Sequence, residues 1–153
     1  MKTKIILIED DKKKIEDIRE FLNAEFNYKN LTIKESYQSG LKALIDNEYD
    51  LLLLDMSIPT WDKSPVEQGG NYEKFGGYKV LKEVIRKGKP IRTILISMFD
   101  DFGESDNSIT LTQLDKILKN EFSSIYIGAI FYSSRETKWR EELKNVLEQE
   151  INR

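Results

Sequence analysis

The 153-residue chain contains no cysteine and no histidine. Without cysteine it can form neither a disulfide framework nor a metal site with thiolate ligands. Without histidine it can hold no histidine-dependent catalytic triad and no histidine-ligated metal, and it cannot itself be a histidine phosphodonor. The chemistry that remains open depends on carboxylates, hydroxyls and amines.

Long apolar runs are also missing. The run closest to the start of the chain, Ile5 to Ile8, is too short for the core of a signal peptide, and no run approaches the length of a membrane span. The net charge is −3, so we expect no surface for nucleic acid and no membrane partner. We expect a cytoplasmic protein whose residues 1–153 form a single domain, with a core large enough to fold without cross-links.

Apolar runs that end in acidic residues occur twice in the sequence. Ile5 to Ile8 precede the segment Glu9-Asp10-Asp11, and Leu51 to Leu54 precede Asp55. A short run of this kind is typical of a strand that is buried on both faces of a parallel sheet. Acidic residues at the carboxyl ends of such strands indicate a site for a cation or a phosphoryl group.

Strand-like and helix-like segments alternate five times along the chain. This alternation predicts an α/β fold, a doubly wound five-stranded parallel sheet with helices on both faces. The flavodoxin-like strand order 2-1-3-4-5 fits, and it makes strands one and three neighbours, so that Glu9 and Asp10 lie beside Asp55. The expected strands cover residues 4–8, 31–37, 51–54, 93–97 and 125–131, and the expected helices begin near residues 12, 39, 78, 111 and 136.

Three segments resemble motifs of the response regulator receiver domains of two-component systems. Glu9-Asp10-Asp11 resembles the acidic pair of that family, and Asp55 with Pro59 four residues later resembles its phosphoacceptor motif. Ser97, at the end of the fourth expected strand, resembles its switch hydroxyl. The resemblance covers nearly the whole chain and is greatest to chemotaxis-regulator-like single domains.

The resemblance implies phosphorelay signalling. Asp55 would accept a phosphoryl group from a histidine kinase or a phosphotransfer protein, since carboxylates can form aspartyl phosphates. Mg²⁺, which prefers oxygen ligands, would be held by Glu9, Asp10, Asp55 and the backbone carbonyl of Ser57. Such a protein is not an enzyme beyond slow autodephosphorylation. With no residues expected to remain for an output domain, it would signal through contacts with an unknown downstream protein.

The chain departs from the family pattern at the end of the fifth expected strand. The family carries a lysine there that contacts the phosphoryl group, whereas this chain has Tyr132, followed by Ser133. Ala129 stands where the family often has a switch aromatic residue. We therefore expect no fixed cation opposite the acidic residues. The alternative function is a pseudo-receiver, an interaction module of the same fold that is not phosphorylated, in which Tyr132 is an ordinary aromatic residue at the edge of the core.

Two loops are longer than the family pattern, an expected insertion at about residues 60–76 and a loop at residues 99–108. Both would lie on the rim around Asp55, and Trp61 and Tyr72 would either anchor a partner or pack locally. Plainer interpretations stay open: the acids at 9–11 as helix-capping residues, and Ser97 as a turn residue. A phosphatase of the haloacid-dehalogenase type is disfavoured, because Ser57 stands where its second aspartate would be.

Overall fold

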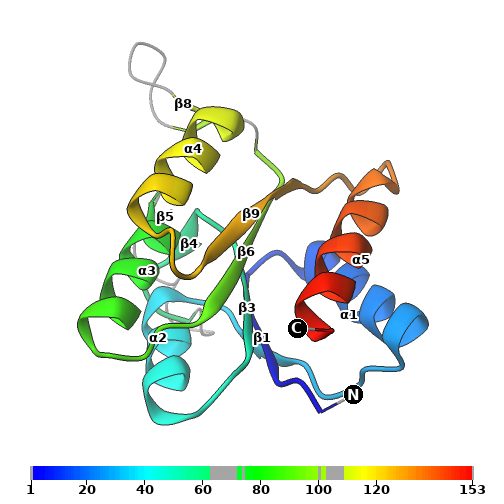
Figure 1. Ribbon diagram of the computed structural model, residues 1–153. Helices are drawn as coiled ribbons and strands as arrows, with labels where there is room; N and C mark the ends of the chain where they lie inside the picture. Colours follow the sequence, from blue (N-terminus) through cyan, green and yellow to red (C-terminus); the bar gives the residue numbers. More distant parts are fainter. Residues whose placement is uncertain (1, 63–71, 74, 100, 103–108, 153) are drawn as a thin grey trace.

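The computed structural model describes residues 2–62, 72–73, 75–99, 101–102 and 109–152 (Figure 1). Five parallel strands form the central sheet in the order predicted from the sequence. Across the sheet these strands are β2 (Thr32–Lys34), β1 (Ile5–Ile8), β3 (Leu51–Leu54), β6 (Arg92–Ser97) and β9 (Tyr126–Phe131). The predicted doubly wound, flavodoxin-like order is therefore confirmed.

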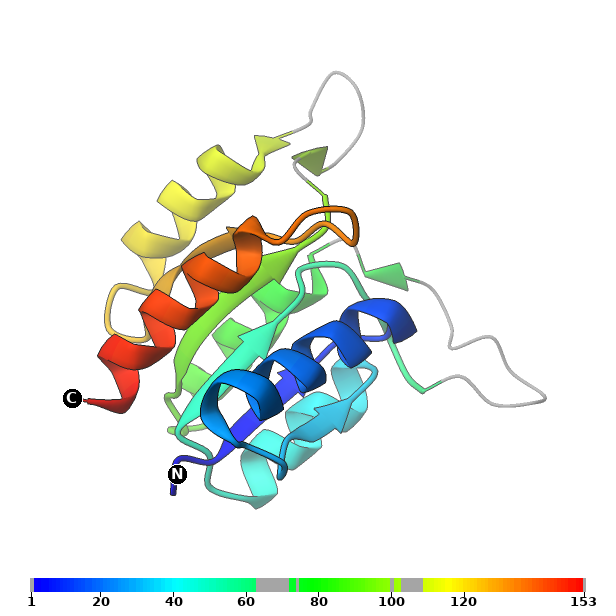
Figure 2. The same cartoon turned by 90° about the vertical axis from the view of Figure 1, so that its right-hand side faces the viewer.

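Helices cover both faces of the sheet. One face carries α1 (Lys12–Phe26) and α5 (Lys138–Ile151), which lie in front of the sheet in Figure 2. The other face carries α2 (Tyr37–Asp46), α3 (Gly76–Arg86) and α4 (Leu111–Glu121) (Figure 1). Each face has its own apolar core between sheet and helices. None of the helices in the described part of the chain is both long enough and apolar enough to cross a membrane.

The two central strands explain why the sheet forms in this register. All four residues of β1 and all four of β3 are buried. Ile6 and Ile8 contribute to the core under α2, α3 and α4, while Ile5 and Leu7 contribute to the core under α1 and α5. A shift of the strand register by one residue would move each set of side chains to the opposite face of the sheet. Such a shift is unfavourable, because burial of each of these side chains contributes about 1.5–3 kcal/mol to stability.

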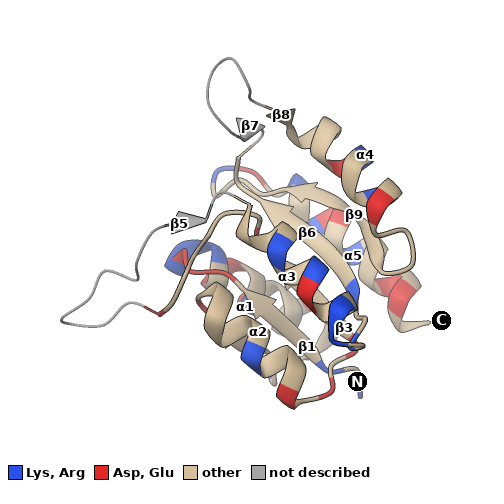
Figure 3. Ribbon diagram, turned by 90° about the vertical axis from the view of Figure 1, so that its left-hand side faces the viewer, with Lys and Arg blue, Asp and Glu red and all other residues tan. Residues whose placement is uncertain are grey.

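Most charged residues of the helices lie on their outward faces, with Lys14 and Asp17 of α1 as buried exceptions. Figure 3 shows basic and acidic residues alternating along α3, where Arg86 Nη2 lies 2.8 Å from Glu83 Oε2. Such exposed pairs contribute little to stability and mainly keep the surface hydrated. The core-facing residues of α3 include Val80, Leu81 and Val84, all buried.

The strand register brings the acidic residues together. Ile8 pairs with Leu54, so the residues that follow, Glu9 and Asp55, stand side by side at the carboxyl edge of the sheet. A hydrogen bond of 3.1 Å from the Asp55 backbone amide to the Ile8 carbonyl continues the pairing past the strands. Leu54 in turn pairs with Leu95 of β6, which places the end of β6 on the other side of Asp55.

Short antiparallel ribbons bound the two long loops. β4 (Ile58–Pro59) pairs with β5 (Tyr72–Glu73), and β7 (Asp101–Phe102) pairs with β8 (Ile109–Thr110). The expected insertion at 60–76 thus leaves and re-enters the domain through one ribbon. Residues 63–71 of that insertion, and residues 103–108 of the second loop, lie outside the described residues.

Several element boundaries differ from those expected, among them the start of α5, which lies at Lys138 rather than near residue 136. β2 ends at Lys34 rather than near residue 37, because Ser36 caps α2: its hydroxyl oxygen accepts a hydrogen bond of 3.1 Å from the Ser39 amide. α2 consequently begins at Tyr37, not at residue 39. α3 begins at Gly76 rather than at Tyr78, because two buried glycines open its first turn. Hydrogen-bonding caps and glycines determine where β2 ends and where α2 and α3 begin, and the spacing of apolar residues does not reveal caps or glycines.

Candidate functional site

Two acidic side chains are buried at the carboxyl edge of the sheet. Glu9 is 0% exposed and Asp55 is 2% exposed. Glu9 Oε2 accepts hydrogen bonds from the backbone amides of Asp10 at 3.0 Å and Asp11 at 3.1 Å, which holds the turn after β1 closed. Asp55 Oδ1 accepts a hydrogen bond of 2.8 Å from the Met56 amide. Both carboxylates are therefore oriented by backbone donors.

A buried lysine lies between these carboxylates. Lys14, in the first turn of α1, is 0% exposed, and its ammonium forms an ion pair with Glu9 Oε1 and lies 3.6 Å from Asp55 Oδ1. It also donates a hydrogen bond of 2.5 Å to the Ile96 carbonyl of β6. The expectation that no fixed cation opposes the acids is therefore wrong. The cation comes from α1, not from the end of the fifth strand of the sheet.

Asp11 fixes the start of the helix that carries this lysine. Its side-chain oxygen accepts a hydrogen bond of 2.9 Å from the Lys14 amide and caps the helix. The capping interpretation of the acidic segment is thus confirmed for Asp11. Glu9, in contrast, points into the interior, where no capping role accounts for it.

Burial dominates the electrostatics of the pair. Desolvation raises the pKa of Glu9 from 4.5 to about 7, with the neighbouring Asp55 charge adding to the rise and Lys14 opposing it. Desolvation likewise raises the pKa of Asp55, and the Lys14 ammonium again opposes the rise. Among the described residues, the Lys14 ammonium is the cation that contacts both acids, so further positive charge would favour their ionised forms. Ion pairing with a cation offsets the free-energy cost of burying an ionised carboxylate.

The predicted Mg²⁺ ligands surround one pocket. Glu9, Asp10, Asp55 and Ser57 all line a cavity of about 750 Å³, together with Asp11, Lys12, Lys13, Met98 and Phe99. Among the residues that the structure describes, Glu9 Oε1 has no hydrogen-bond partner besides its ion pair with Lys14, so this buried oxygen could accept a further bond from a cation or its water. No preformed group of three acidic side chains placed to hold a metal occurs in the described part of the chain. Mg²⁺ does not need one, because it is commonly held by one or two carboxylates with waters and phosphate oxygens. The donor set therefore fits Mg²⁺.

Ser97 is buried beside this pocket without lining it. Its hydroxyl donates a hydrogen bond of 2.9 Å to the Phe99 carbonyl and accepts one of 3.0 Å from the Phe99 amide. These bonds close the turn after β6, as the plainer interpretation expects. A switch role for Ser97 stays a prediction, and it requires that the hydroxyl exchange these partners for a phosphoryl oxygen.

Tyr132 does not point at Asp55. Its hydroxyl donates a hydrogen bond of 2.5 Å to Asp17 Oδ2 on α1, and its ring packs against Trp139 with the ring centroids 5.3 Å apart. The side chain is 3% exposed and belongs to the core under α1 and α5. Burial and the bond to Asp17 raise the pKa of Tyr132, so it stays neutral. The interpretation of Tyr132 as a core aromatic residue is confirmed.

Lys14 and Asp17 are the residues that sequence reasoning missed. Lys14 precedes the buried residues Ile18 and Phe21 by four and seven positions, which places it on the apolar face of α1. A lysine at such a position needs a buried anionic partner. That spacing is the signal in the sequence by which Lys14 could have been found.

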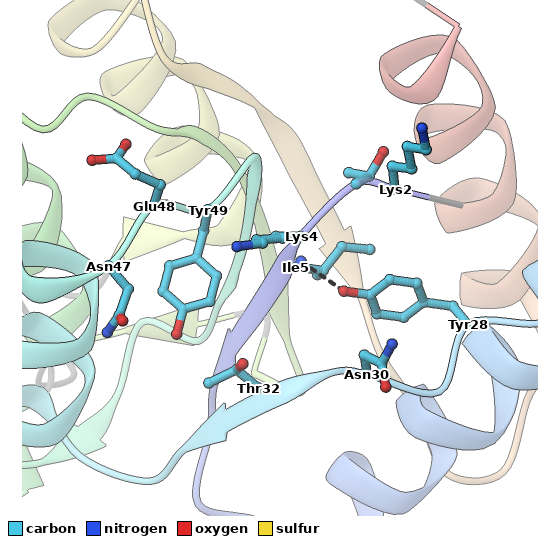
Figure 4. Close-up of a pocket in the computed structure, with 10 residues that line it drawn as sticks. Lys2, Lys4, Ile5, Tyr28, Asn30, Thr32, Asn47, Glu48 and Tyr49 are labelled. Atoms are coloured by element: carbon cyan, nitrogen blue, oxygen red, sulfur yellow. Dashed lines mark hydrogen bonds between the residues drawn. The ribbon is translucent and has the colours of Figure 1, made fainter.

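A second pocket lies at the opposite end of the sheet (Figure 4). It is lined by residues around the start of β1, and the Ile5 amide there donates a hydrogen bond of 2.9 Å to the Tyr28 hydroxyl. Ligands of open α/β sheets bind at the carboxyl ends of the strands. The acidic pocket is therefore the candidate site, and the pocket in Figure 4 is separate from it.

Comparisons with solved structures define the fold. The receiver domain of sensor histidine kinase PA1611 from Pseudomonas aeruginosa, solved with a magnesium ion in its active-site cleft, aligns over 99% of this chain and 98% of its own, with a TM-score of 0.60 and 17% identity. Other receiver domains match in the same way. The chain has the fold of a response regulator receiver domain.

Sequence relatives define the family more narrowly. The chain is 30% identical over 145 residues to the uncharacterized protein y4jR of Sinorhizobium fredii, covering 93% of this chain and 95% of that one, and it belongs to the same family. It is 24% identical to the Detocs response regulatory protein DtcB of Enterobacter cloacae, over 92% of this chain and 95% of that one. No protein-family model matches the chain.

Proposed function

We propose that the protein is a receiver, a single domain over residues 1–153, that accepts a phosphoryl group on Asp55 with the help of Mg²⁺. The donor is a histidine kinase or a phosphotransfer protein, and the output is contact with a downstream protein. The name of DtcB, a response regulatory protein, supports the signalling class. The magnesium ion in the PA1611 receiver supports the choice of metal.

The observation that carries the proposal is the placement of Asp55. Its carboxylate is buried at the carboxyl end of β3 and lines the same pocket as Glu9, Asp10 and Ser57. A buried acid is costly to the fold, because burial raises its pKa and opposes ionisation, and such perturbed groups cluster at functional sites. A nucleophilic carboxylate with charge partners around it accounts for this arrangement.

The transfer needs positioning more than covalent machinery. An Asp55 carboxylate oxygen forms a bond to phosphorus while the bond from phosphorus to the donor nitrogen breaks, and the nitrogen keeps the electron pair. The Met56 amide donates a hydrogen bond of 2.8 Å to Asp55 Oδ1 and so orients the carboxylate for the attack. Asp10, Asp55 and the Ser57 carbonyl are the residues that would hold Mg²⁺. When bound, the metal neutralises charge on the acids and on the incoming phosphoryl oxygens.

The test is an adduct that depends on Asp55. The protein is incubated with Mg²⁺ and acetyl phosphate, and intact mass is measured over time, with Asp55→Asn as the matched variant. We expect the wild type to gain one phosphoryl group, the variant to gain none, and chelation of the metal to stop the reaction. An unmodified wild type, or a variant modified to the same extent, would contradict the proposal.

One observation favours the pseudo-receiver as the second candidate. The Lys14 ammonium already contacts both Glu9 and Asp55, so these two acids have a cationic partner without any metal. If that ion cluster is purely structural, the protein will bind its partner without Mg²⁺ or phosphate. The same mass measurement separates the candidates, because only the receiver forms an adduct.

A further inference from the structure

One ammonium joins the ends of three neighbouring strands. Lys14 contacts Glu9 after β1, Asp55 after β3 and the Ile96 carbonyl within β6. Its side chain is completely buried, although it projects from the helix face that also carries Ile15 and Ile18. Burying an unpaired ammonium is costly, and the surrounding oxygens offset that cost only in this arrangement. The buried position of Lys14 therefore depends on its contacts with Glu9 and Asp55.

The neighbouring Tyr132 has a different role. Its hydroxyl is engaged with Asp17, which leaves it no proton for a group on Asp55. Its ring instead lies near the lysine, with Lys14 Nζ 6.0 Å from the ring centroid, within the range of a weak cation–π contact. Tyr132, directly after β9, thus lies next to the ammonium of Lys14, which belongs to α1.

We propose that Lys14 supplies the positive charge that the strand-five lysine would supply in a typical receiver. Before transfer it acts as a positioning residue that orients the Asp55 carboxylate, from which its ammonium lies 3.6 Å away. After transfer, its ammonium donates a hydrogen bond to a phosphoryl oxygen on Asp55. This inference rests on the proposed function and adds to it the residue that contacts the phosphoryl group.

The Lys14 charge also affects metal binding. Lys14 pairs with the same carboxylates that attract Mg²⁺, so its charge weakens metal binding while it speeds phosphoryl transfer. Removing the charge should move the two properties in opposite directions. A purely structural lysine would not do this, because general loosening of the site weakens both.

The test compares Lys14→Met, which keeps an unbranched side chain, with Tyr132→Phe and with the exposed control Lys42→Met on α2. Adduct formation from acetyl phosphate is followed by intact mass, and Mg²⁺ binding by calorimetry. We expect Lys14→Met to form the adduct about tenfold to a thousandfold more slowly, on the scale of losing one oxyanion donor. We expect its dissociation constant for Mg²⁺ to fall, by about tenfold. Tyr132→Phe and Lys42→Met should form the adduct at the wild-type rate.

Three results would each overturn the inference. The first is a wild-type rate of adduct formation in Lys14→Met, and the second is a slow rate in Tyr132→Phe. The third is weaker Mg²⁺ binding in Lys14→Met than in the wild type. All three differ from failure of the proposed function. In that case the wild type itself forms no adduct, and both the proposed function and the role of Lys14 are contradicted.

A measurement on the wild type covers the case in which Lys14→Met does not fold. The nitrogen resonance of the Lys14 ammonium is followed by NMR during titration with beryllofluoride and Mg²⁺. We expect it to shift as the ammonium exchanges a carboxylate contact for a fluorine of the adduct. An adduct that leaves this resonance unchanged would overturn the inference.

Discussion

Gly77 allows α3 to approach the backbone that follows Asp55. A Cβ at this position would lie 2.6 Å from the Asp55 carbonyl oxygen and 3.0 Å from the Met56 Cα, and the Gly77 amide donates a hydrogen bond of 2.9 Å to the Met56 carbonyl. The absent side chain thus helps to fix the loop that carries the phosphoacceptor candidate.

Gly77→Ala should therefore destabilise the protein. Overpacking against backbone costs about 1–3 kcal/mol, because neither chain segment can move aside easily. Gly128→Ala is the matched control, since a Cβ there meets none of the described residues within 4 Å, and it should stay within about 0.5 kcal/mol of the wild type. Urea unfolding measures both, and equal effects of the two substitutions would contradict this role for Gly77.

Asp17 makes the stability of the fold depend on pH in the acid range. Burial raises the pKa of Asp17, but hydrogen bonds from Tyr132 and Lys13 outweigh it, so its pKa lies below the ordinary 3.8. Below that value the unfolded chain binds the proton more readily than the folded one, so stability rises with pH there. The contribution of Asp17 is present above pH 3.8 and is lost as the pH falls through the folded pKa.

The free energy of unfolding of wild type and Asp17→Asn should therefore converge as the pH is lowered. We expect the wild type to be more stable near neutral pH, by about 1–3 kcal/mol for a hydrogen bond to a charged group. The difference should shrink between about pH 4 and pH 2. Urea unfolding across this range is the measurement, and a constant difference would contradict the assignment.

At the scale of elements, α4 is held by a reciprocal cap at its start. The Thr110 hydroxyl accepts a hydrogen bond of 3.1 Å from the Gln113 amide, and the Thr110 amide donates one of 2.9 Å to Gln113 Oε1. This capping box fixes where the chain re-enters the domain after the loop that leaves β6. It anchors that loop at its far end.

Thr110→Ala should cost about 1 kcal/mol of stability, because a helix-start amide loses its acceptor. Thr110→Ser keeps the hydroxyl and should behave nearly as the wild type. Thermal or urea unfolding of the two variants checks this. An alanine variant as stable as the serine variant would show that the cap contributes nothing measurable.

The elements also show which parts of the fold could be predicted from sequence. Leu51 to Leu54 and Ile5 to Ile8 predicted the central strands, because burial on both faces leaves a continuous apolar run. The start of α3 could not be predicted from apolar spacing, because it depends on the close approach of Gly77 to Asp55. Periodicity reports which face is buried, whereas caps and close backbone contacts are set by tertiary structure.

At the scale of the whole molecule, topology makes a single site out of distant residues. Strand order was enough to predict that Glu9 and Asp55 meet, since parallel strands share one carboxyl edge. The sequence pattern did not predict the partner cation, because the family carries its lysine at the end of the last strand, where this chain has Tyr132. The sheet register alone does not show that a helix residue such as Lys14 reaches the same edge.

The fold also connects the acidic pocket to an exposed part of the surface. Lys14 ties α1 to β6 through the Ile96 carbonyl, and the next residue along β6, Ser97, closes the turn that leads to Phe99. Phe99 is 50% exposed and lines the acidic pocket. If Asp55 accepts a phosphoryl group, as proposed, and that group contacts Lys14 or Ser97, we expect the surface near Phe99 to change, and this surface would then be the place where a partner detects the change.

The most direct test of the central claim is fluorine NMR of the protein with Mg²⁺ and beryllofluoride, which mimics the phosphoryl group on a carboxylate. The account predicts bound fluorine resonances in the wild type that disappear in Asp55→Asn and after chelation of the metal. A wild type without bound resonances, or resonances that persist in Asp55→Asn, would contradict the claim that Asp55 and its neighbouring acids form a phosphoryl-accepting site.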